Sequence, residues 1–78
     1  MTLRDFLIQE IKNITFKTVT SDESLIQSGL LSSITVVDLV VAIEEQYNIK
    51  IPFIEITKNN FDTIELIIQF LKGKGLAV

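Results

Sequence analysis

The chain lacks cysteine, histidine and tryptophan altogether, and its 78 residues include only three glycines and one proline. Without cysteine there is no disulfide framework, no thiolate nucleophile and no thiolate metal site. Without histidine the chain has neither the commonest general base nor the commonest transition-metal ligand. A serine–histidine catalytic unit is therefore excluded within this chain. We expect no catalytic residue and no metal site, and the composition argues against an enzyme.

The overall charge is mildly acidic, with 7 basic residues against 10 acidic ones and a formal net charge of −3. A nucleic-acid-binding domain normally carries a basic patch, so we expect no nucleic-acid partner. The chain is 47% hydrophobic and 22% charged, which is unlike the polar, highly charged composition of a disordered tail. This composition predicts one small folded domain over residues 1–78, with a single modest core.

No segment has the pattern of a targeting signal or of a membrane span. Arg4 is followed at once by Asp5, and no apolar stretch with a small-residue cleavage site comes after it. The longest apolar run, residues 39–43, is far shorter than a membrane-spanning helix requires. We therefore expect no membrane span and a cytoplasmic location.

Apolar periodicity and capping residues predict two helices in the first half of the chain. A first helix is expected over residues 3–14, where apolar residues recur at helical spacing after the N-cap Thr2. Residues 15–31 show no regular period, so we expect a long connection that scattered apolar side chains pin over the core. A second helix should follow the N-cap Ser32 and run to about Tyr47.

The pattern after Pro52 predicts shorter elements. Residues 53–58 can hold one short helical turn. The last helix is expected to begin at Asp62, with Glu65 as its capping-box partner, and to end at Gly73. Together the elements predict an all-α fold, a small three- to four-helix bundle with a long first loop.

The second predicted helix carries two apolar faces. At about 100° per residue, one side gathers the residues expected in the core: Val36, Leu39, Val40, Ile43 and Tyr47. The opposite side carries a second apolar stripe among carboxylates: Ile34, Val37 and Val41 with Asp38, Glu44 and Glu45. One helix cannot readily bury two opposite faces in so small a bundle, so we expect this stripe to be exposed at least in part. It is typical of a docking face for a partner with a basic groove, although a covering loop or self-association would also account for it.

Ser33 is the residue of this helix that is best placed to carry a covalently attached group. It occupies the first helical position, where unpaired backbone N–H groups and the helix dipole favour an anion. A phosphate attached to its hydroxyl would be stabilised there and presented beside the exposed stripe, which begins at Ile34. The alternative is that Ser32 and Ser33 are only a doubled cap.

Two stretches of the sequence resemble the acyl carrier proteins and the related peptidyl carriers. One is Gly-Leu-Leu-Ser-Ser-Ile at residues 29–34 with its continuation to Pro52, and the other is residues 61–67. The likeness covers essentially the whole chain. In that family an Asp-Ser-Leu motif opens the second helix, and its serine accepts a 4′-phosphopantetheine arm. The resemblance implies a bundle of the acyl-carrier-protein type with the arm attached to Ser33.

The sequence departs from the family motif beside the attachment serine. Ser32 stands where the family has Asp, and Thr35 stands where many fatty-acid carriers have an acidic residue. An alternative register, with the arm on Ser32, would place a second serine where the motif has leucine. The Gly-Leu-Leu lead-in is more similar to stand-alone carriers allied to the peptidyl and D-alanyl types than to fatty-acid carriers.

The resemblance implies a stand-alone carrier that holds acyl or aminoacyl groups as thioesters on an arm derived from coenzyme A. Its partners would be a phosphopantetheinyl transferase, an acyl- or aminoacyl-loading enzyme, and downstream synthases of fatty-acid, polyketide or nonribosomal-peptide-type biosynthesis. We expect a monomer, since such a module visits several enzymes. A further hypothesis is that branched aliphatic side chains part around a short cargo: Val36, Leu39, Val40, Ile64 and Ile68. The alternative function is a non-covalent helical adaptor that uses the Ile34, Val37 and Val41 face with Ser33 unmodified.

Overall fold

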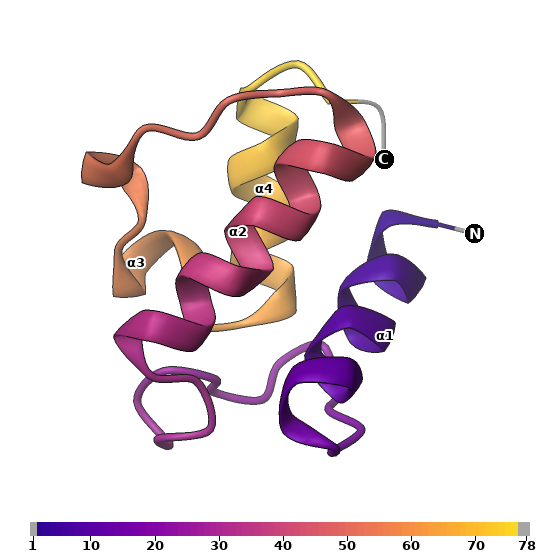
Figure 1. Cartoon of the computed structure of the whole chain (residues 1–78), viewed down its shortest axis with the longest axis vertical. Helices are drawn as coiled ribbons and strands as arrows, with labels where there is room; N and C mark the ends of the chain where they lie inside the picture. The colour runs from indigo at the N-terminus through magenta and orange to yellow at the C-terminus, as the bar shows by residue number, and fades with distance from the viewer. Residues whose placement is uncertain (1, 77–78) are drawn as a thin grey trace.

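The computed structural model describes residues 2–76, and within that range every regular element is helical (Figure 1). The elements are α1 (Leu3–Thr15), α2 (Ser33–Tyr47), the short 3₁₀ helix η1 (Phe53–Glu55), α3 (Lys58–Phe61) and α4 (Ile64–Gly73). The predicted all-α bundle with a long first loop is confirmed. No helix among these residues is long and apolar enough to cross a lipid bilayer.

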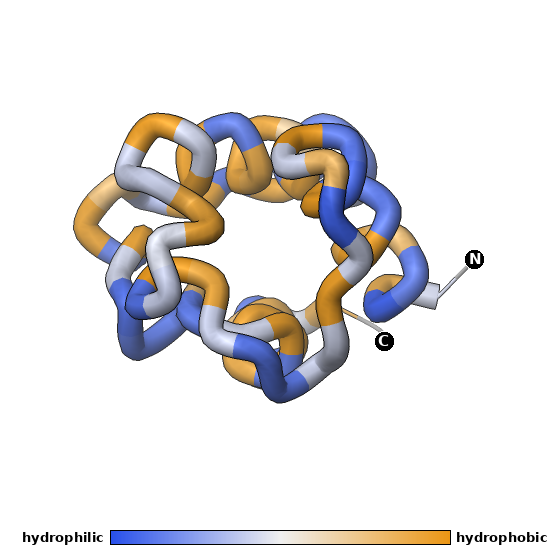
Figure 2. The backbone as a smooth tube through the Cα atoms, turned by 90° about the horizontal axis from the view of Figure 1, so that it is seen from below, coloured by the Kyte–Doolittle hydropathy of each residue, from blue (hydrophilic) through white to orange (hydrophobic). Residues whose placement is uncertain are grey.

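The three longer helices form the body of the molecule, and α3 and η1 lie to one side of α2. In Figure 1, α1 runs down the page while α2 and α4 run up it, with α4 behind α2. The view from below in Figure 2 shows the helices and the long connection closing a ring in which apolar and polar positions alternate. Each of the four α-helices turns apolar side chains inward.

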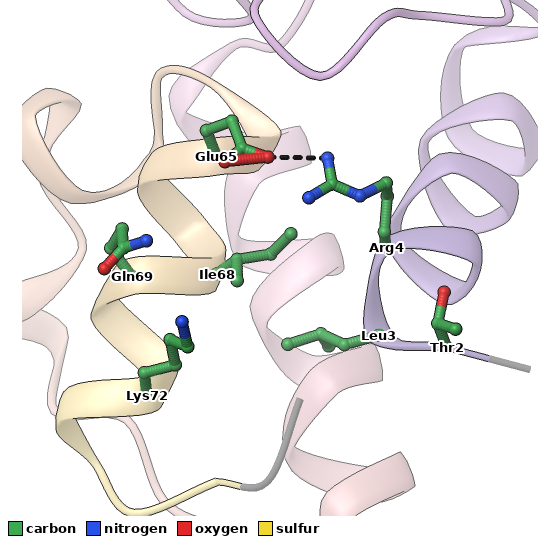
Figure 3. Close-up of a pocket in the computed structure, with 7 residues that line it drawn as sticks. All are labelled: Thr2, Leu3, Arg4, Glu65, Ile68, Gln69 and Lys72. Carbon is green, nitrogen blue, oxygen red and sulfur yellow. Dashed lines mark ion pairs between the residues drawn. The ribbon is translucent and has the colours of Figure 1, made fainter.

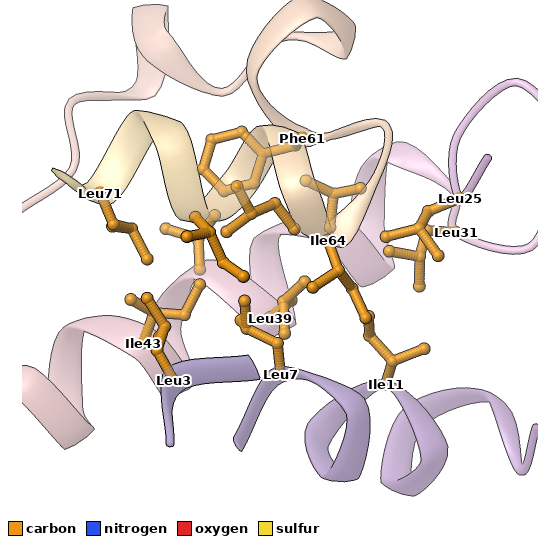
Figure 4. Packing of buried hydrophobic residues seen from close by; sticks show 14 of the residues in the cluster. Leu3, Leu7, Ile11, Leu25, Leu31, Leu39, Ile43, Phe61, Ile64 and Leu71 are labelled. Carbon is orange, nitrogen blue, oxygen red and sulfur yellow. The ribbon is translucent and has the colours of Figure 1, made fainter. Parts of the chain in front are cut away.

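Apolar side chains from all four α-helices and from the long connection fill the interior (Figure 4). The largest of the fully buried residues are Phe61, Leu7, Ile11, Leu25, Leu31, Leu39, Ile43, Ile64, Ile67 and Leu71. Within residues 2–76 no polar or charged residue is classed as buried. The core is therefore stabilised by apolar burial, at roughly 25 cal/mol per Å² of surface removed from water.

The ends of α1 and α2 follow from their capping residues. The side chain of Thr2 accepts a hydrogen bond from the Asp5 amide, and α1 ends at Phe16, which adopts left-handed backbone angles with φ 64°. Asn48 ends α2 in the same conformation, with φ 54°. Asparagine tolerates this region better than most residues, which explains why the helix stops where the sequence predicted.

The start of the last helix was predicted wrongly. α4 begins at Ile64, and Thr63 is its N-cap, because the Thr63 hydroxyl accepts a 3.0 Å hydrogen bond from the Leu66 amide. Asp62 instead ends the preceding helix α3. Thr and Asp are both good N-caps, so local preference did not separate them, and the Asp62 carboxylate is used by another part of the chain. The expected turn at residues 53–58 appears as η1, while the separate α3 was not predicted.

The long connection, residues 16–32, is held against the helices as expected. Val19, Leu25 and Leu31 are buried in the core cluster. Two backbone hydrogen bonds also join the connection to the α3–α4 region, one from the Glu65 amide to the Ser21 carbonyl and one from Leu25 to Asp62. The connection therefore packs as part of the core and is not a free loop.

A shallow seam separates α1 from α4 (Figure 3). An ion pair of 2.5 Å joins Arg4 Nη1 to Glu65 Oε1, and the same nitrogen donates to Ser21 Oγ. Beside it lies a hollow of about 250 Å³, lined in part by Leu3 and Ile68. Both charged side chains are more than a third exposed, so the pair contributes no more than about 1 kcal/mol. Burial of Leu3 and Ile68 does more to hold the seam.

Candidate functional site

The N-terminus of α2 is ordered by a capping box built from Ser32 and Thr35. The Thr35 amide donates to Ser32 Oγ over 3.3 Å, and the Ser32 amide donates to Thr35 Oγ1 over 2.7 Å. Two backbone N–H groups that the helix leaves unpaired are thereby satisfied. Ser32 is therefore fully engaged as the cap, in agreement with the sequence prediction.

Ser33 is the first residue of α2 and its side chain is exposed. Among the residues that the structure describes, its hydroxyl has no hydrogen-bond partner, whereas the Ser32 hydroxyl caps the helix. The first turn of α2 contains no acidic residue, so the positive end of the helix dipole is not neutralised locally. The geometry therefore separates the two serines: one caps the helix, and the other has an exposed hydroxyl that the described residues leave without a hydrogen bond.

A cavity of about 200 Å³ opens beside Ser33, between α2 and the η1–α3 region. Five of the eight residues that line it are apolar, namely Ile26, Val36, Val37, Phe53 and Ile56, and the other three are Ser33, Thr57 and Lys58. A group attached to Ser33 would meet this apolar wall on one side and solvent on the other. An exposed hydroxyl with open space beside it is what a long covalently attached arm requires, so these residues fit such a group.

The residues expected to shelter a cargo do not line this cavity, with the exception of Val36. Leu39 and Ile64 are completely buried, and Val40 and Ile68 are nearly so. All four belong to the core cluster, in which Figure 4 labels Leu39 and Ile64.

The second apolar face of α2 is exposed as the sequence predicted. Ile34 is 74% exposed, Val37 36% and Val41 44%. Asp38 and Glu45 lie exposed on the same helix. Large apolar side chains on a surface beside carboxylates mark a place where another molecule can bind.

Glu44 differs from its acidic neighbours on α2. Its side chain is half-buried, and Glu44 Oε2 accepts a 2.7 Å hydrogen bond from the Ile51 amide. It therefore holds the segment after α2 against the helix. This contact joins residues seven positions apart and could not be read from the helical period.

Two further exposed apolar residues were missed by the sequence analysis. Phe53 is 80% exposed and Ile54 83%, both in η1, and Phe53 lines the cavity together with Val37. The available signal was a pair of large apolar residues directly after Pro52, in a segment without apolar periodicity. They extend the apolar surface from α2 across the cavity to η1.

The Asp62 carboxylate holds the end of the long connection. Asp62 Oδ1 accepts hydrogen bonds from the amides of Ile26 and Gln27, each 2.9 Å long, and from Ser24 Oγ at 3.0 Å. The Gln27 amide, followed by the Ile26 amide, the Ser24 hydroxyl and the charge of Lys58, lowers the pKa of Asp62 below its ordinary value of 3.8. Desolvation acts in the opposite direction. Sequence analysis missed this role because the partners lie more than 30 positions away.

The small helical bundle has an exposed serine at the start of α2 and an apolar face beside it, an arrangement that fits a carrier domain for a covalently attached group. In agreement, a family model described as "Phosphopantetheine attachment site" matches residues 5–71. The chain belongs to this family of phosphopantetheine-binding carrier proteins.

The chain is also similar to D-alanyl carrier proteins of Streptococcus pyogenes, including those of serotype M5 (strain Manfredo), serotype M49 (strain NZ131) and serotype M1. Each is 38% identical over 48 residues, which is 62% of this chain and 61% of the relative. The matched part is thus less than two thirds of these relatives.

Family membership carries two consequences. The cofactor is 4′-phosphopantetheine, covalently attached, and the expected cofactor is thereby confirmed. Carrier proteins are not catalysts, so this chain is not an enzyme. The described residues contain no cluster of three or more acidic, histidine or cysteine side chains that could hold a metal ion.

Proposed function

We propose that the 4′-phosphopantetheine arm is attached to Ser33 and that the chain carries acyl or aminoacyl groups on it as thioesters. The observation that supports this assignment is the contrast between the two neighbouring serines. Ser32 Oγ is used by the helix cap, whereas Ser33 Oγ is exposed beside an open cavity and has no hydrogen-bond partner within residues 2–76.

The chain contributes the nucleophile to the attachment reaction but no base. A bond forms between Ser33 Oγ and the phosphorus next to the pantetheine moiety of coenzyme A. The phosphoanhydride bond at that phosphorus breaks, and adenosine 3′,5′-bisphosphate leaves. The serine proton passes to a base on the transferase, since the chain has no histidine. Once attached, the arm supplies the terminal thiol that a cysteine-free protein lacks.

An aminoacyl group is the cargo that the comparisons favour. The relatives named above are D-alanyl carrier proteins, and the alignment with them covers 62% of this chain. A loading enzyme that activates an amino acid would then be the first partner after the transferase. An acyl-loading assay would also test the other cargo classes, which are fatty-acyl, polyketide and peptidyl groups. The cytoplasmic location and the monomeric state stay predictions.

The attachment is tested by intact mass after incubation with coenzyme A, Mg²⁺ and a broad-specificity phosphopantetheinyl transferase. We expect the wild-type chain to gain one phosphopantetheine unit, Ser33→Ala to gain none, and Ser32→Ala to gain it. Ser32→Ala is the matched control, because it removes the neighbouring hydroxyl and only weakens the cap. Modification of Ser33→Ala but not of Ser32→Ala would show that the arm is on Ser32. A wild-type chain that no transferase modifies would leave the non-covalent adaptor as the better function.

The proposed docking face for partner enzymes consists of Ile34, Val37 and Val41 with Asp38, Glu44 and Glu45 on α2, together with Phe53 and Ile54 on η1. The exposure of its apolar members supports the proposal, and so does its position next to Ser33. The carboxylates would steer a partner with basic residues around its own active site. Glu44 would contribute mainly by holding the segment that leads to η1.

The docking face is tested with Val37→Asp, which places a charge in its centre. We expect kcat/KM of the transferase to fall at least about fivefold, the effect of losing about 1 kcal/mol of contact energy. Leu66→Asp is the control. Leu66 is 39% exposed and Val37 36%, but Leu66 lies on α4, away from the proposed face. Far-ultraviolet circular dichroism should be unchanged in both. An equal loss of activity in Leu66→Asp would contradict a localised docking face.

A further inference from the structure

The Asp62 side chain helps to tie the segment that leads to Ser33 to the distant junction of α3 and α4. Three donors of this segment converge on the Asp62 carboxylate: the Ser24 hydroxyl and the amides of Ile26 and Gln27, all within 3.1 Å. The Leu25 amide also donates to the Asp62 carbonyl at 2.5 Å. We call residues 24–27 with the Asp62 carboxylate the loop clamp.

The loop clamp is coupled to the attachment site through two contacts. The side chain of Ile26, whose amide is held by Asp62, is part of the cavity wall beside Ser33. The Leu31 amide donates to the Leu25 carbonyl at 2.7 Å, so the residue just before the cap Ser32 is hydrogen-bonded to the clamped segment. Between them Gly29 turns the chain at φ 85°, a conformation that a glycine adopts without strain. Movement of residues 24–27 would therefore reach the cavity wall beside Ser33 and the residue before the cap Ser32.

The donors of the loop clamp are matched to a charged acceptor, the Asp62 carboxylate. Hydrogen bonds from amides and a hydroxyl to a carboxylate are stronger than those to a neutral acceptor, because the acceptor carries a full charge. Among the described residues, Asp62 is also the one side chain that bonds both amides of the Ile26–Gln27 pair. Without it, the burial of Leu25 and the hydrogen bond of its amide to the Asp62 carbonyl would keep the segment near the core, but the hydrogen bonds that hold the Ile26 and Gln27 amides would be lost.

We propose that Asp62 is a positioning residue for the attachment serine: by holding residues 24–27 it fixes the wall beside Ser33 in the arrangement that a phosphopantetheinyl transferase binds. This inference rests on the proposed attachment at Ser33. Asp62 does not touch the reacting atoms, and it acts through the segment that it holds.

The test compares Asp62→Asn, Asp62→Ala and Thr63→Ala in the unmodified full chain. Asparagine keeps the shape and one acceptor oxygen but removes the charge. Thr63→Ala is the matched control, since it removes the neighbouring N-cap hydrogen bond to Leu66 and leaves residues 24–27 untouched. Two quantities are measured at a temperature where all variants are folded: amide hydrogen exchange at Ile26 and Gln27, and kcat/KM for attachment.

We expect exchange at Ile26 and Gln27 to accelerate about tenfold in Asp62→Asn and more in Asp62→Ala, because charge-assisted hydrogen bonds are lost. Attachment should slow on the order of tenfold, since small misplacements of a reacting group are costly. Thr63→Ala should change neither the exchange rates nor kcat/KM for attachment by more than about twofold. It should lower stability by about 1 kcal/mol, a roughly fivefold shift in the folding equilibrium.

Three outcomes would overturn the inference: unchanged exchange in the Asp62 variants, faster exchange with wild-type attachment, or equally slow attachment in Thr63→Ala. The last of these would mean that only global stability matters. A wild-type chain that takes up no arm would refute the proposed function and the positioning role with it, whereas the exchange data would still show whether Asp62 holds the segment.

Discussion

The Asp62 carboxylate also makes the stability of the protein depend on pH in a defined way. Replacing it with asparagine removes the charge from an acceptor that takes two amide hydrogen bonds of 2.9 Å. A hydrogen bond to a charged group contributes about 1 kcal/mol more than one between neutral groups, and Asp62 is only half-buried. We therefore expect Asp62→Asn to lower the free energy of unfolding at pH 7 by about 1–2 kcal/mol. In a domain of this size that lowers Tm by between about 4 and 16 °C.

The direction of the pH effect follows from the lowered pKa of Asp62. A group whose pKa is lower in the folded state contributes stability above its unfolded pKa and loses it as pH falls through the folded value. The ordinary value of 3.8 marks the upper edge of that window. The Tm difference between wild type and Asp62→Asn should thus be constant from pH 7 to about pH 5 and shrink below pH 4.

Thermal unfolding followed by circular dichroism at pH 7, 5, 4 and 3 measures this difference directly. All other titrating groups are common to both chains, so their effects cancel in the comparison. A Tm difference that persists unchanged to pH 3, or an asparagine variant more stable than wild type at pH 7, would refute the reasoning.

The remaining predictions concern the cap and the core. Ser32→Asp keeps an N-cap acceptor and adds a negative charge at the start of α2, where the first turn has none, so it should stabilise the protein by about 0.3–1 kcal/mol. The gain should appear in thermal unfolding at low ionic strength and diminish at 1 M salt; an equal gain at both would contradict a dipole effect. Leu39→Ala empties a fully buried position and should cost about 2–5 kcal/mol in urea unfolding. Val41→Ala, on the exposed face of the same helix, should change stability by less than about 0.5 kcal/mol, and a comparable loss would show that this face is not free.

The successes of the sequence analysis share a physical origin. The N-cap at Ser32, the stop at Asn48 and the two faces of α2 all depend on residues within a few positions of each other. Helical periodicity and side-chain-to-backbone hydrogen bonds are local, so they can be read along the chain. For the same reason Ser33 could be placed at the first helical position before the fold was known.

The sequence analysis failed where a residue's role depended on parts of the chain outside its own helix. Asp62 and Thr63 can each cap a helix, and only the fold shows that Asp62 bonds a segment 36 residues away. Sequence analysis also missed the hydrogen bond that Glu44 accepts from the Ile51 amide, while the place of Glu44 in the docking face stays a prediction. Phe53 and Ile54 show no period, so their exposure depended on the path of the chain after Pro52.

The sequence by itself determined the class of fold, the limits of α1 and α2, the exposed stripe on α2 and the family resemblance centred on Ser33. These features follow from composition, local hydrogen bonding and the helical repeat, which need no distant partner. Only the tertiary structure decided that a cavity lies beside Ser33, that η1 extends the apolar surface and that Asp62 holds the segment leading to the serine. Each of these depends on residues far apart in the chain, whose distances are set by how the helices pack and not by the order of residues within any one of them.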